Sequence, residues 1–173
     1  QVVSMATTTG FATADFNSWP LFLPYVLLYA AIIGACAGST GGGMKVIRIL
    51  LIFKQGFREV QRLIHPRAVI PIKLGGQRVS DRIVESVWGF FAVYVMVFLI
   101  MLLALLATGL DIVTAFSAVG ACINNLGPGL AEVAVTYGQL PAAAKWILCF
   151  AMLLGRLEIF TLLVLFTPMF WKR

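Results

Sequence analysis

Charged residues are scarce in this 173-residue sequence: they make up 12% of it, whereas 61% of the residues are hydrophobic. The mean hydropathy, +0.97, is far above that of a soluble domain. The one histidine, His65, has no cluster of serine and acidic residues around it, so we expect no enzyme activity. The three cysteines are odd in number and show no C-x-x-C spacing, which argues against disulfides and metal sites. This composition predicts an integral membrane protein.

The basic residues gather in one part of the chain. Of 13 lysines and arginines, nine lie between Lys45 and Arg82, and two more end the chain. This grouping is typical of the cytoplasmic side of a membrane protein, so we expect contact with membrane lipid and none with nucleic acid. Within it, residues 69–79 alternate between apolar and polar side chains around Gly75-Gly76, which predicts a small hairpin.

The stretch Asn124-Asn125-Leu126-Gly127-Pro128-Gly129 follows an apolar run too short to cross a bilayer. That run, 112–123, has 12 residues, or roughly 18 Å of helix, against a hydrocarbon core of about 30 Å. The glycines and the proline break a helix and leave backbone carbonyls without intrahelical partners. At membrane depth such backbone is tolerated where it is buried in protein or lines a watery cavity. The pattern predicts a re-entrant helix, capped by Asp111, and a loop of free carbonyls like that of an ion filter; an ordinary extracellular turn is the alternative.

A second copy of this pattern lies at the start of the sequence. Its Gly10, in Thr7-Thr8-Thr9-Gly10-Phe11-Ala12, follows the apolar residues 1–6 and aligns with Gly127. With the same offset, Asp15 aligns with Glu132. The later copy then has four extra residues, after which Pro20 aligns with Pro141 and Gly34 with Gly155. Self-similarity at a fixed spacing indicates a repeated structural unit, and membrane proteins commonly build a central pathway from such repeats.

A glycine-rich stretch interrupts the apolar run that follows the first copy. Residues 21–37 are apolar, as are residues 44–53 apart from two basic side chains, but Gly38-Ser39-Thr40-Gly41-Gly42-Gly43 lies between them. Each glycine costs about 0.8 to 1 kcal/mol relative to alanine in a helix, so we predict a helix that is broken within the membrane. The stretch lacks the final Gly-Lys-Ser/Thr of a phosphate-binding loop. A flexible hinge with close helix packing and a mobile plug inside a pore remain open, and the frequency of broken helices in transport pathways favours the plug.

Two further apolar runs are long enough to cross a bilayer. Residues 87–107 form 21 consecutive positions without a charge, roughly 31 Å of helix. Residues 141–171 are expected to form the last span, with Arg156 and Glu158 near its middle. With the basic segment inside, both glycine loops lie outside together with Asp15, Asp111 and Glu132. An acidic outer mouth attracts cations.

These motifs resemble a known family. The stretches "TTTGFA" (7–12), "GSTGGGMK" (38–45), "NNLGPG" (124–129) and "GRLEIFTLLVLFTPMFW" (155–171) are similar, in kind and in order, to the Trk/Ktr/HKT potassium transporters, and most closely to the bacterial TrkH type. The resemblance implies an all-α integral membrane protein, potassium-channel-like, built from M1-pore helix-M2 units with re-entrant filter loops and a broken M2 helix. The chain would supply the end of a third repeat (1–63), a basic cytoplasmic loop or hairpin (64–82) and a fourth repeat (83–173).

The resemblance also implies which residues handle the ion, with K+ held by backbone carbonyls of the filter and no covalently bound cofactor. The potassium-filter residues would be Thr8, Thr9, Gly10, Phe11, Asn125, Leu126, Gly127 and Pro128. The gating residues would be Gly38, Ser39, Thr40, Gly41, Gly42, Gly43 and Arg156. Since the repeat alignment places Arg156 level with Ala35, one turn before the glycine break, we predict that its guanidinium donates hydrogen bonds to carbonyls that the break sets free. A structural arginine bonded to another helix is the alternative.

For the whole protein the resemblance implies potassium uptake across the bacterial inner membrane, with the basic loop and the C-terminus cytoplasmic. Its implied partners are the missing repeats in the upstream part of the same polypeptide, a second copy in a homodimer, and a cytosolic nucleotide-binding regulatory ring (TrkA-like). The residues themselves leave two other functions open. A proton- or sodium-coupled symporter with alternating access needs titratable groups at mid-membrane, such as Glu158. A non-transporting scaffold subunit would make the paired loops a coincidence, and ion flux separates it from a transporter.

Overall fold

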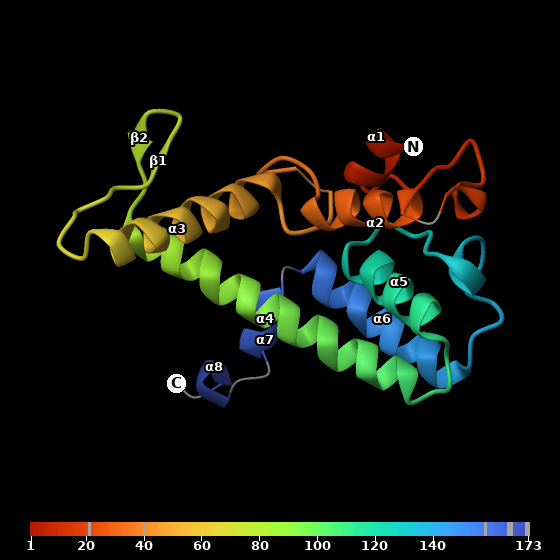
Figure 1. Ribbon diagram of the computed structural model, residues 1–173. Helices are drawn as coiled ribbons and strands as arrows, with labels where there is room; N and C mark the ends of the chain where they lie inside the picture. Colours follow the sequence, from red (N-terminus) through yellow and green to blue (C-terminus); the bar gives the residue numbers. More distant parts are fainter. Residues whose placement is uncertain (21, 40, 158, 166–167, 172–173) are drawn as a thin grey trace.

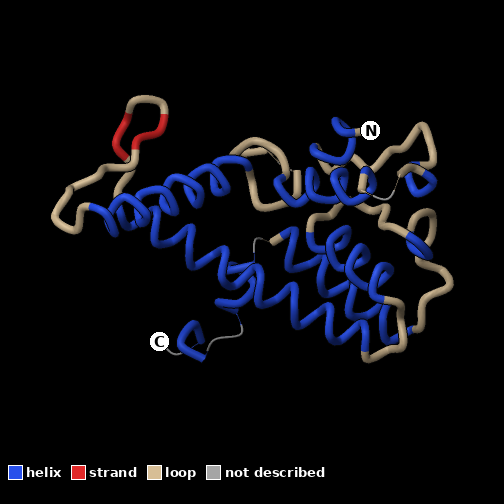
Figure 2. The backbone as a smooth tube through the Cα atoms, in the orientation of Figure 1, coloured by secondary structure: helices blue, strands red, loops and turns tan. Residues whose placement is uncertain are grey.

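A computed structural model describes residues 1–20, 22–39, 41–157, 159–165 and 168–171 of the chain (Figure 1). The described residues are mainly helical and carry one small hairpin (Figure 2). The α-helices are α1 (Val2–Ala6), α2 (Leu23–Ile33), α3 (Val46–Ile64), α4 (Asp81–Leu106), α5 (Ile112–Ile123), α6 (Ala142–Arg156), α7 (Ile159–Leu165) and α8 (Pro168–Trp171). The short 3-10 helices are η1 (Phe16–Ser18) and η2 (Ala131–Val133), and the strands are β1 (Lys73–Leu74) and β2 (Gln77–Arg78).

The short helix α5 forms the centre of the molecule, because α4, α6 and α2 all pack against it (Figure 1). Its bounds confirm the predicted 12-residue helix, and the Asp111 side chain caps it by accepting a hydrogen bond from the Val113 N–H at 3.1 Å. Small side chains, including the fully buried Ala115 and Ala118, let the neighbouring helices approach closely. A helix too short to cross a bilayer therefore lies between α2, α4 and α6.

The two copies of the repeat meet in a second apolar cluster. Met5 of α1 and Leu27 and Leu28 of α2 come from the first copy, whereas Ala121 of α5 and Leu126 come from the second. Burial of these side chains removes apolar surface from water or lipid and fixes how the copies sit against each other. The segment after α1 therefore lies beside the segment after α5, more than one hundred residues away in sequence.

The predicted hairpin is confirmed, with Lys73 paired to Arg78 across the Gly75-Gly76 turn. It projects from the end of the molecule at which α3 ends and α4 begins (Figure 2). There the buried Arg58 of α3 donates a hydrogen bond to the Asp81 carboxylate at 2.6 Å, which ties α3 to the first residue of α4.

Two predicted helices differ from the observed ones. In the apolar run 21–37 the helix covers only Leu23–Ile33. It ends four residues before the glycine-rich stretch, because Gly34 adopts a left-handed φ of +74°. The last span is not one continuous helix, since α6 ends at Arg156 and α7 begins at Ile159. α6 ends one residue after Gly155, and because Gly155 has no side chain, the backbone of α6 can approach the last residue of α5, Ile123, closely.

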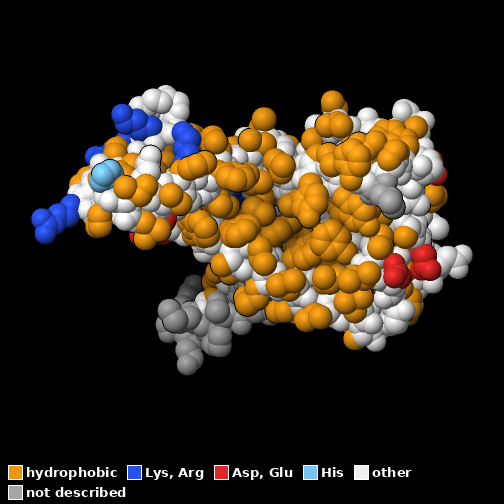
Figure 3. Space-filling model, in the orientation of Figure 1, with side chains coloured by type: hydrophobic (Ala, Val, Ile, Leu, Met, Phe, Trp, Pro, Cys, Tyr) orange, Lys and Arg blue, Asp and Glu red, His pale blue; other side chains and the backbone are white. Residues whose placement is uncertain are grey.

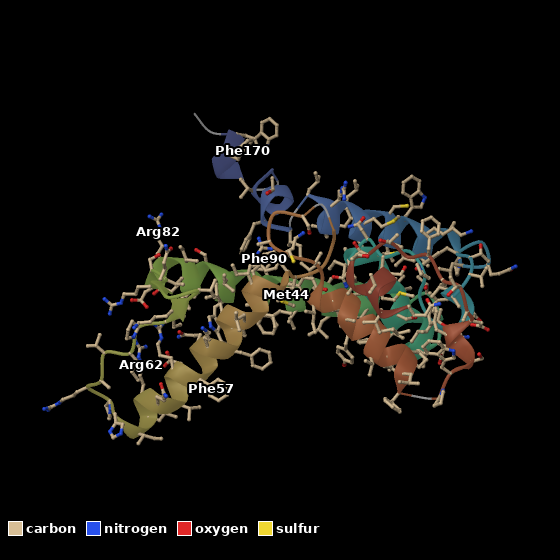
Figure 4. All side chains as sticks on the ribbon, turned by 90° about the horizontal axis from the view of Figure 1, so that it is seen from above. Met44, Phe57, Arg62, Arg82, Phe90 and Phe170 are labelled. Atoms are coloured by element: carbon tan, nitrogen blue, oxygen red, sulfur yellow. The ribbon has the colours of Figure 1, made fainter. Side chains whose placement is uncertain are left out.

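The surface is strongly apolar along the helices. Figure 3 shows hydrophobic side chains over most of the visible face, with lysine and arginine gathered at the hairpin end and acidic side chains visible at the opposite edge. In the part of the chain that the structure describes, α4 is the one helix long and apolar enough to cross a membrane. Figure 4 shows Phe57 and Arg62 pointing away from α3, and Phe57 is 71% exposed.

Candidate functional site

The two glycine loops leave their helices through the same hydrogen bonds. In the first copy the amides of Thr7, Thr8 and Thr9 donate to the carbonyls of Val3, Met5 and Ser4. In the second copy the amides of Asn124, Asn125 and Leu126 donate to the carbonyls of Gly120, Cys122 and Ala121. Every donor and every acceptor is 117 positions from its counterpart, which is the offset between Gly10 and Gly127. The sequence repeat is therefore a repeat of backbone conformation.

The backbone angles of the loops repeat in the same way. Thr8 and Asn125 are aligned and have φ of +57° and +53°, and the aligned Gly10 and Gly127 have φ of +77° and +100°. A left-handed threonine is uncommon because its branched side chain opposes that conformation. Left-handed residues thus alternate with residues of negative φ in both loops. This alternation differs from the backbone of a helix and from that of a strand.

The loops also touch each other. A Cβ atom added to Gly10 would lie 2.3 Å from the Leu126 carbonyl oxygen and 3.1 Å from Cδ of Pro128. Glycine is therefore required at this position by space as well as by its positive φ. Gly127 differs, because nothing lies within 4 Å of the corresponding point. The site thus contains one tightly packed glycine and one with open space beside it.

The glycine-rich break lies directly against both loops. A Cβ atom on Gly42 would lie 1.7 Å from the Asn124 carbonyl oxygen, and the Gly42 amide donates a hydrogen bond to the Thr8 hydroxyl at 2.9 Å. Gly41 lies beside Thr7 and Thr8 of the same loop. The predicted filter and gating segments are thereby brought together, although residues 41–43 are far from residues 124–129 in sequence.

Asn124 anchors the end of α5. Its side chain is fully buried; the amide nitrogen donates to the Gly120 carbonyl at 2.6 Å, and the amide oxygen accepts a hydrogen bond from the Tyr94 hydroxyl of α4 at 3.1 Å. These bonds hold the residue at which the helix becomes a loop. The sequence indicated a role for Asn125 but none for Asn124 or Tyr94, because no local pattern shows that Tyr94 contacts a residue 30 positions away.

We expect Tyr94→Phe to lower the free energy of unfolding by about 1 to 3 kcal/mol, since it leaves the buried Asn124 amide oxygen without this donor. The measurement is thermal or denaturant unfolding of the full-length protein in detergent. Tyr29→Phe is the matched control, because Tyr29 is 57% exposed on α2. Equal stability of the two variants would contradict the anchoring role of Tyr94.

A cavity of about 290 Å³ lies between the break, the second loop and the end of α6. Three cationic residues line it: Lys45, Arg48 and Arg156. Lys45 donates hydrogen bonds from its Nζ atom to the carbonyls of Ser39 and Gly41. The Arg48 guanidinium lies 4.2 Å from the ring centroid of Phe90, in a cation–π contact. Met44, which follows the glycine-rich stretch, belongs to the same apolar cluster as Phe90 (Figure 4).

The predicted residues differ in how closely they gather. The predicted filter residues lie in two loops that contact each other, and Gly41 and Gly42 contact these loops. Phe11 is 80% exposed. Arg156 shares the cavity with the break, whereas Gly38 has nothing within 4 Å of a Cβ position. Thr40 and Glu158 lie outside the described residues.

Lys45 and Arg48 lie in the cavity wall, although in the sequence they stand out only as two basic residues in an apolar run. Lys45 takes two of the carbonyls in the break, a role that we predicted for Arg156. The sequence does contain a signal that Lys45 and Arg48 have partners. A basic side chain within a membrane segment is energetically costly unless it is paired.

The geometry defines a helical protein with two repeated helix-loop units meeting at a broken helix, and comparison with known proteins agrees with this description. The family model TrkH, described as a cation transport protein, matches residues 1–173. This chain belongs to the TrkH family, whose members are membrane proteins.

Relatives of known name are similar along the whole chain. It is 62% identical over 173 residues to the Trk system potassium uptake protein TrkH of Halomonas elongata, covering 100% of this chain and 36% of that protein. It is 61% identical over 172 residues to TrkH of Escherichia coli strain K12, covering 99% and 36%. The crystal structure of the potassium transporter TrkH from Vibrio parahaemolyticus matches with a TM-score of 0.91 and 60% identity, covering 98% of this chain and 36% of that one. The chain thus spans about a third of the length of these relatives.

Proposed function

We propose that this chain forms half of a potassium uptake pore in the bacterial inner membrane, with the two glycine loops as two of four filter strands. The observation that carries the proposal is the matched pair of loops, which share their helix-exit hydrogen bonds and their left-handed positions and lie in contact. The proposal also draws on relatives that are named potassium uptake proteins. The remaining strands would come from the rest of the polypeptide.

The chemistry of the loops suits a dehydrated monovalent cation. Carbonyl oxygens that face one side can replace the hydration shell of K+. Both loops follow the C-terminal end of a helix, where the helix dipole places a partial negative charge of about half an elementary charge. The proposed K+ ligands are the carbonyls of Thr8, Thr9, Gly10, Asn125 and Leu126, with those of Phe11, Gly127 and Pro128 at the outer end of the loops.

The broken helix suits a gate. Gly41 and Gly42 contact the first loop, Gly42 also contacts the second, and the cavity beside them is lined by Lys45, Arg48 and Arg156. Positive charge at this place raises the energy of a cation that leaves the filter. Displacement of the break together with its lysine would open the path. We therefore propose that the break and Arg156 regulate flux through the pore.

The charge pattern supports one orientation. The basic hairpin end would be cytoplasmic, and Asp15, Asp111 and Glu132 would surround the outer mouth. A homodimer and a cytosolic nucleotide-binding ring remain proposals that rest on the family resemblance.

Gly127→Ser is the sharpest test of the filter. A side chain fits beside Gly127, so the protein should fold, but a non-glycine residue strains the φ of +100° and moves carbonyls near the ion. We expect the potassium-to-sodium flux ratio of the full-length protein in liposomes to fall by roughly tenfold, a change of about 1.4 kcal/mol in discrimination.

Gly109→Ser is the matched control, because Gly109 also has a positive φ (+87°) and open space but lies in the turn between α4 and α5. It should keep the wild-type ratio. An unchanged ratio in folded Gly127→Ser protein would refute the filter assignment, and saturating flux tied to a second ion would favour a symporter.

A further inference from the structure

The two loops are anchored in different ways at their outer ends. In the first copy the Ser4 hydroxyl donates a hydrogen bond to the Phe11 carbonyl at 2.6 Å. The residue aligned with Ser4 in the second copy is Ala121, which has no hydroxyl group. The second loop can be anchored only by a donor from elsewhere, and the carbonyl that is held is that of Gly127, one residue before Pro128, the counterpart of Phe11.

Tyr137 supplies such a donor. Its hydroxyl donates a hydrogen bond to the Gly127 carbonyl at 2.6 Å, and Cys122 of α5 lies nearby. These three residues line a cavity of about 470 Å³ between the second loop and α6. Nothing lies within 4 Å of the position of a Gly127 side chain, so no contact at that point restrains the glycine.

The turn that carries Tyr137 is itself fixed. The Leu140 amide donates to the Tyr137 carbonyl at 3.3 Å, and the Leu140 side chain is buried. Lys145 of α6 donates from its Nζ atom to the Gly138 carbonyl at 2.8 Å. This turn lies in residues 133–140, the segment that contains the four residues by which the second copy exceeds the first. Counted back from the aligned Pro20 and Pro141, Tyr137 falls on Phe16, which has no hydroxyl group.

We propose that Tyr137 is a positioning residue for ion selectivity, which fixes the Gly127 peptide plane from outside the filter and makes the ring of carbonyls asymmetric. The proposal rests on the proposed function, since it assumes that Gly127 belongs to the filter. A carbonyl oxygen has two lone pairs, so the bond to Tyr137 leaves one for the ion. Without the hydroxyl, the glycine peptide can rotate, and a ring with a mobile carbonyl adjusts more easily to the smaller Na+.

The test is Tyr137→Phe in the full-length protein, which removes the hydroxyl and keeps the ring. We expect potassium-to-sodium discrimination to fall about threefold to tenfold, the range that one hydrogen bond is worth, with potassium flux retained. Two readouts are measured: bi-ionic flux in liposomes, and the shift of unfolding temperature in detergent as KCl replaces NaCl. The second reports ion binding without transport.

Tyr29→Phe is the matched control and should leave both readouts unchanged, because Tyr29 is exposed on α2. Lys145→Met removes the bond to the Gly138 carbonyl and leaves the Tyr137 hydroxyl in place, so it should lower the potassium-to-sodium flux ratio by a smaller factor. This variant replaces Tyr137→Phe as the test if Tyr137→Phe does not fold. If the wild type is selective and folded Tyr137→Phe and Lys145→Met proteins keep its potassium-to-sodium flux ratio, the role of Tyr137 is overturned. A wild type without ion preference in either readout overturns the proposed function and this inference with it. Equal loss of potassium and sodium flux would show a purely structural role and also overturns the inference.

Discussion

Replacing Arg156 with alanine should raise the basal potassium flux of the full-length protein. Arg156 lines the cavity between the break and the end of α6, together with Lys45 and Arg48. A unit charge about 6 Å from a permeating cation raises its energy by about 3 kcal/mol at an effective dielectric constant near 20, or about a hundredfold in occupancy. The two other cations keep part of the barrier, so this value is an upper limit. The measurement is potassium efflux from liposomes.

Two variants separate charge from structure. Arg156→Lys keeps the positive charge and should keep the basal flux low, whereas Arg82→Ala removes an arginine at the start of α4, outside the cavity, and should change nothing. Deletion of residues 41–43 should raise flux as Arg156→Ala does, because it removes the segment that lies against both loops. Folded Arg156→Ala protein with unchanged or reduced flux would show that the arginine is structural and would refute its gating role.

Gly155→Ala should destabilise the protein although alanine is the better helix former. At an exposed helical site this change gains up to about 1 kcal/mol. At Gly155, however, the added Cβ would lie 1.9 Å from the Ile123 carbonyl oxygen and 2.7 Å from the side-chain Nδ2 atom of Asn125, so α6 and the second loop must separate. Overpacking of this kind costs about 1 to 3 kcal/mol. We expect a lower unfolding temperature and a lower potassium-to-sodium flux ratio.

Gly89→Ala is the matched control within another helix. Its Cβ would meet nothing closer than Phe160 Cζ at 4.0 Å, so helix propensity should dominate and the unfolding temperature should stay the same or rise. The two substitutions are chemically identical, and opposite signs are expected because only Gly155 touches another backbone. A stabilised Gly155→Ala protein would mean that α6 does not approach the second loop this closely.

Features that depend on neighbouring residues were predictable from the sequence. The bounds of α5 and its Asp111 cap follow from a short apolar run after a capping residue, and the hairpin follows from alternation around two glycines. The break was expected from glycine content alone, although its start at Gly34 depends on how that residue ends α2. The interruption after Arg156 was missed, because one glycine and two charged residues do not by themselves distinguish a break from a continuous helix.

The sequence by itself determined the helical membrane character, the repeat that aligns Gly10 with Gly127, and the candidate residues, because these depend on composition and spacing. The tertiary structure alone decided which of them touch: Gly42 against Asn124, Gly10 against Leu126, and Lys45 on the carbonyls of the break. These contacts join segments that are far apart in the chain or meet only after a sharp turn. Their geometry depends on how α2, α4 and α6 pack around α5, and no local pattern contains that information.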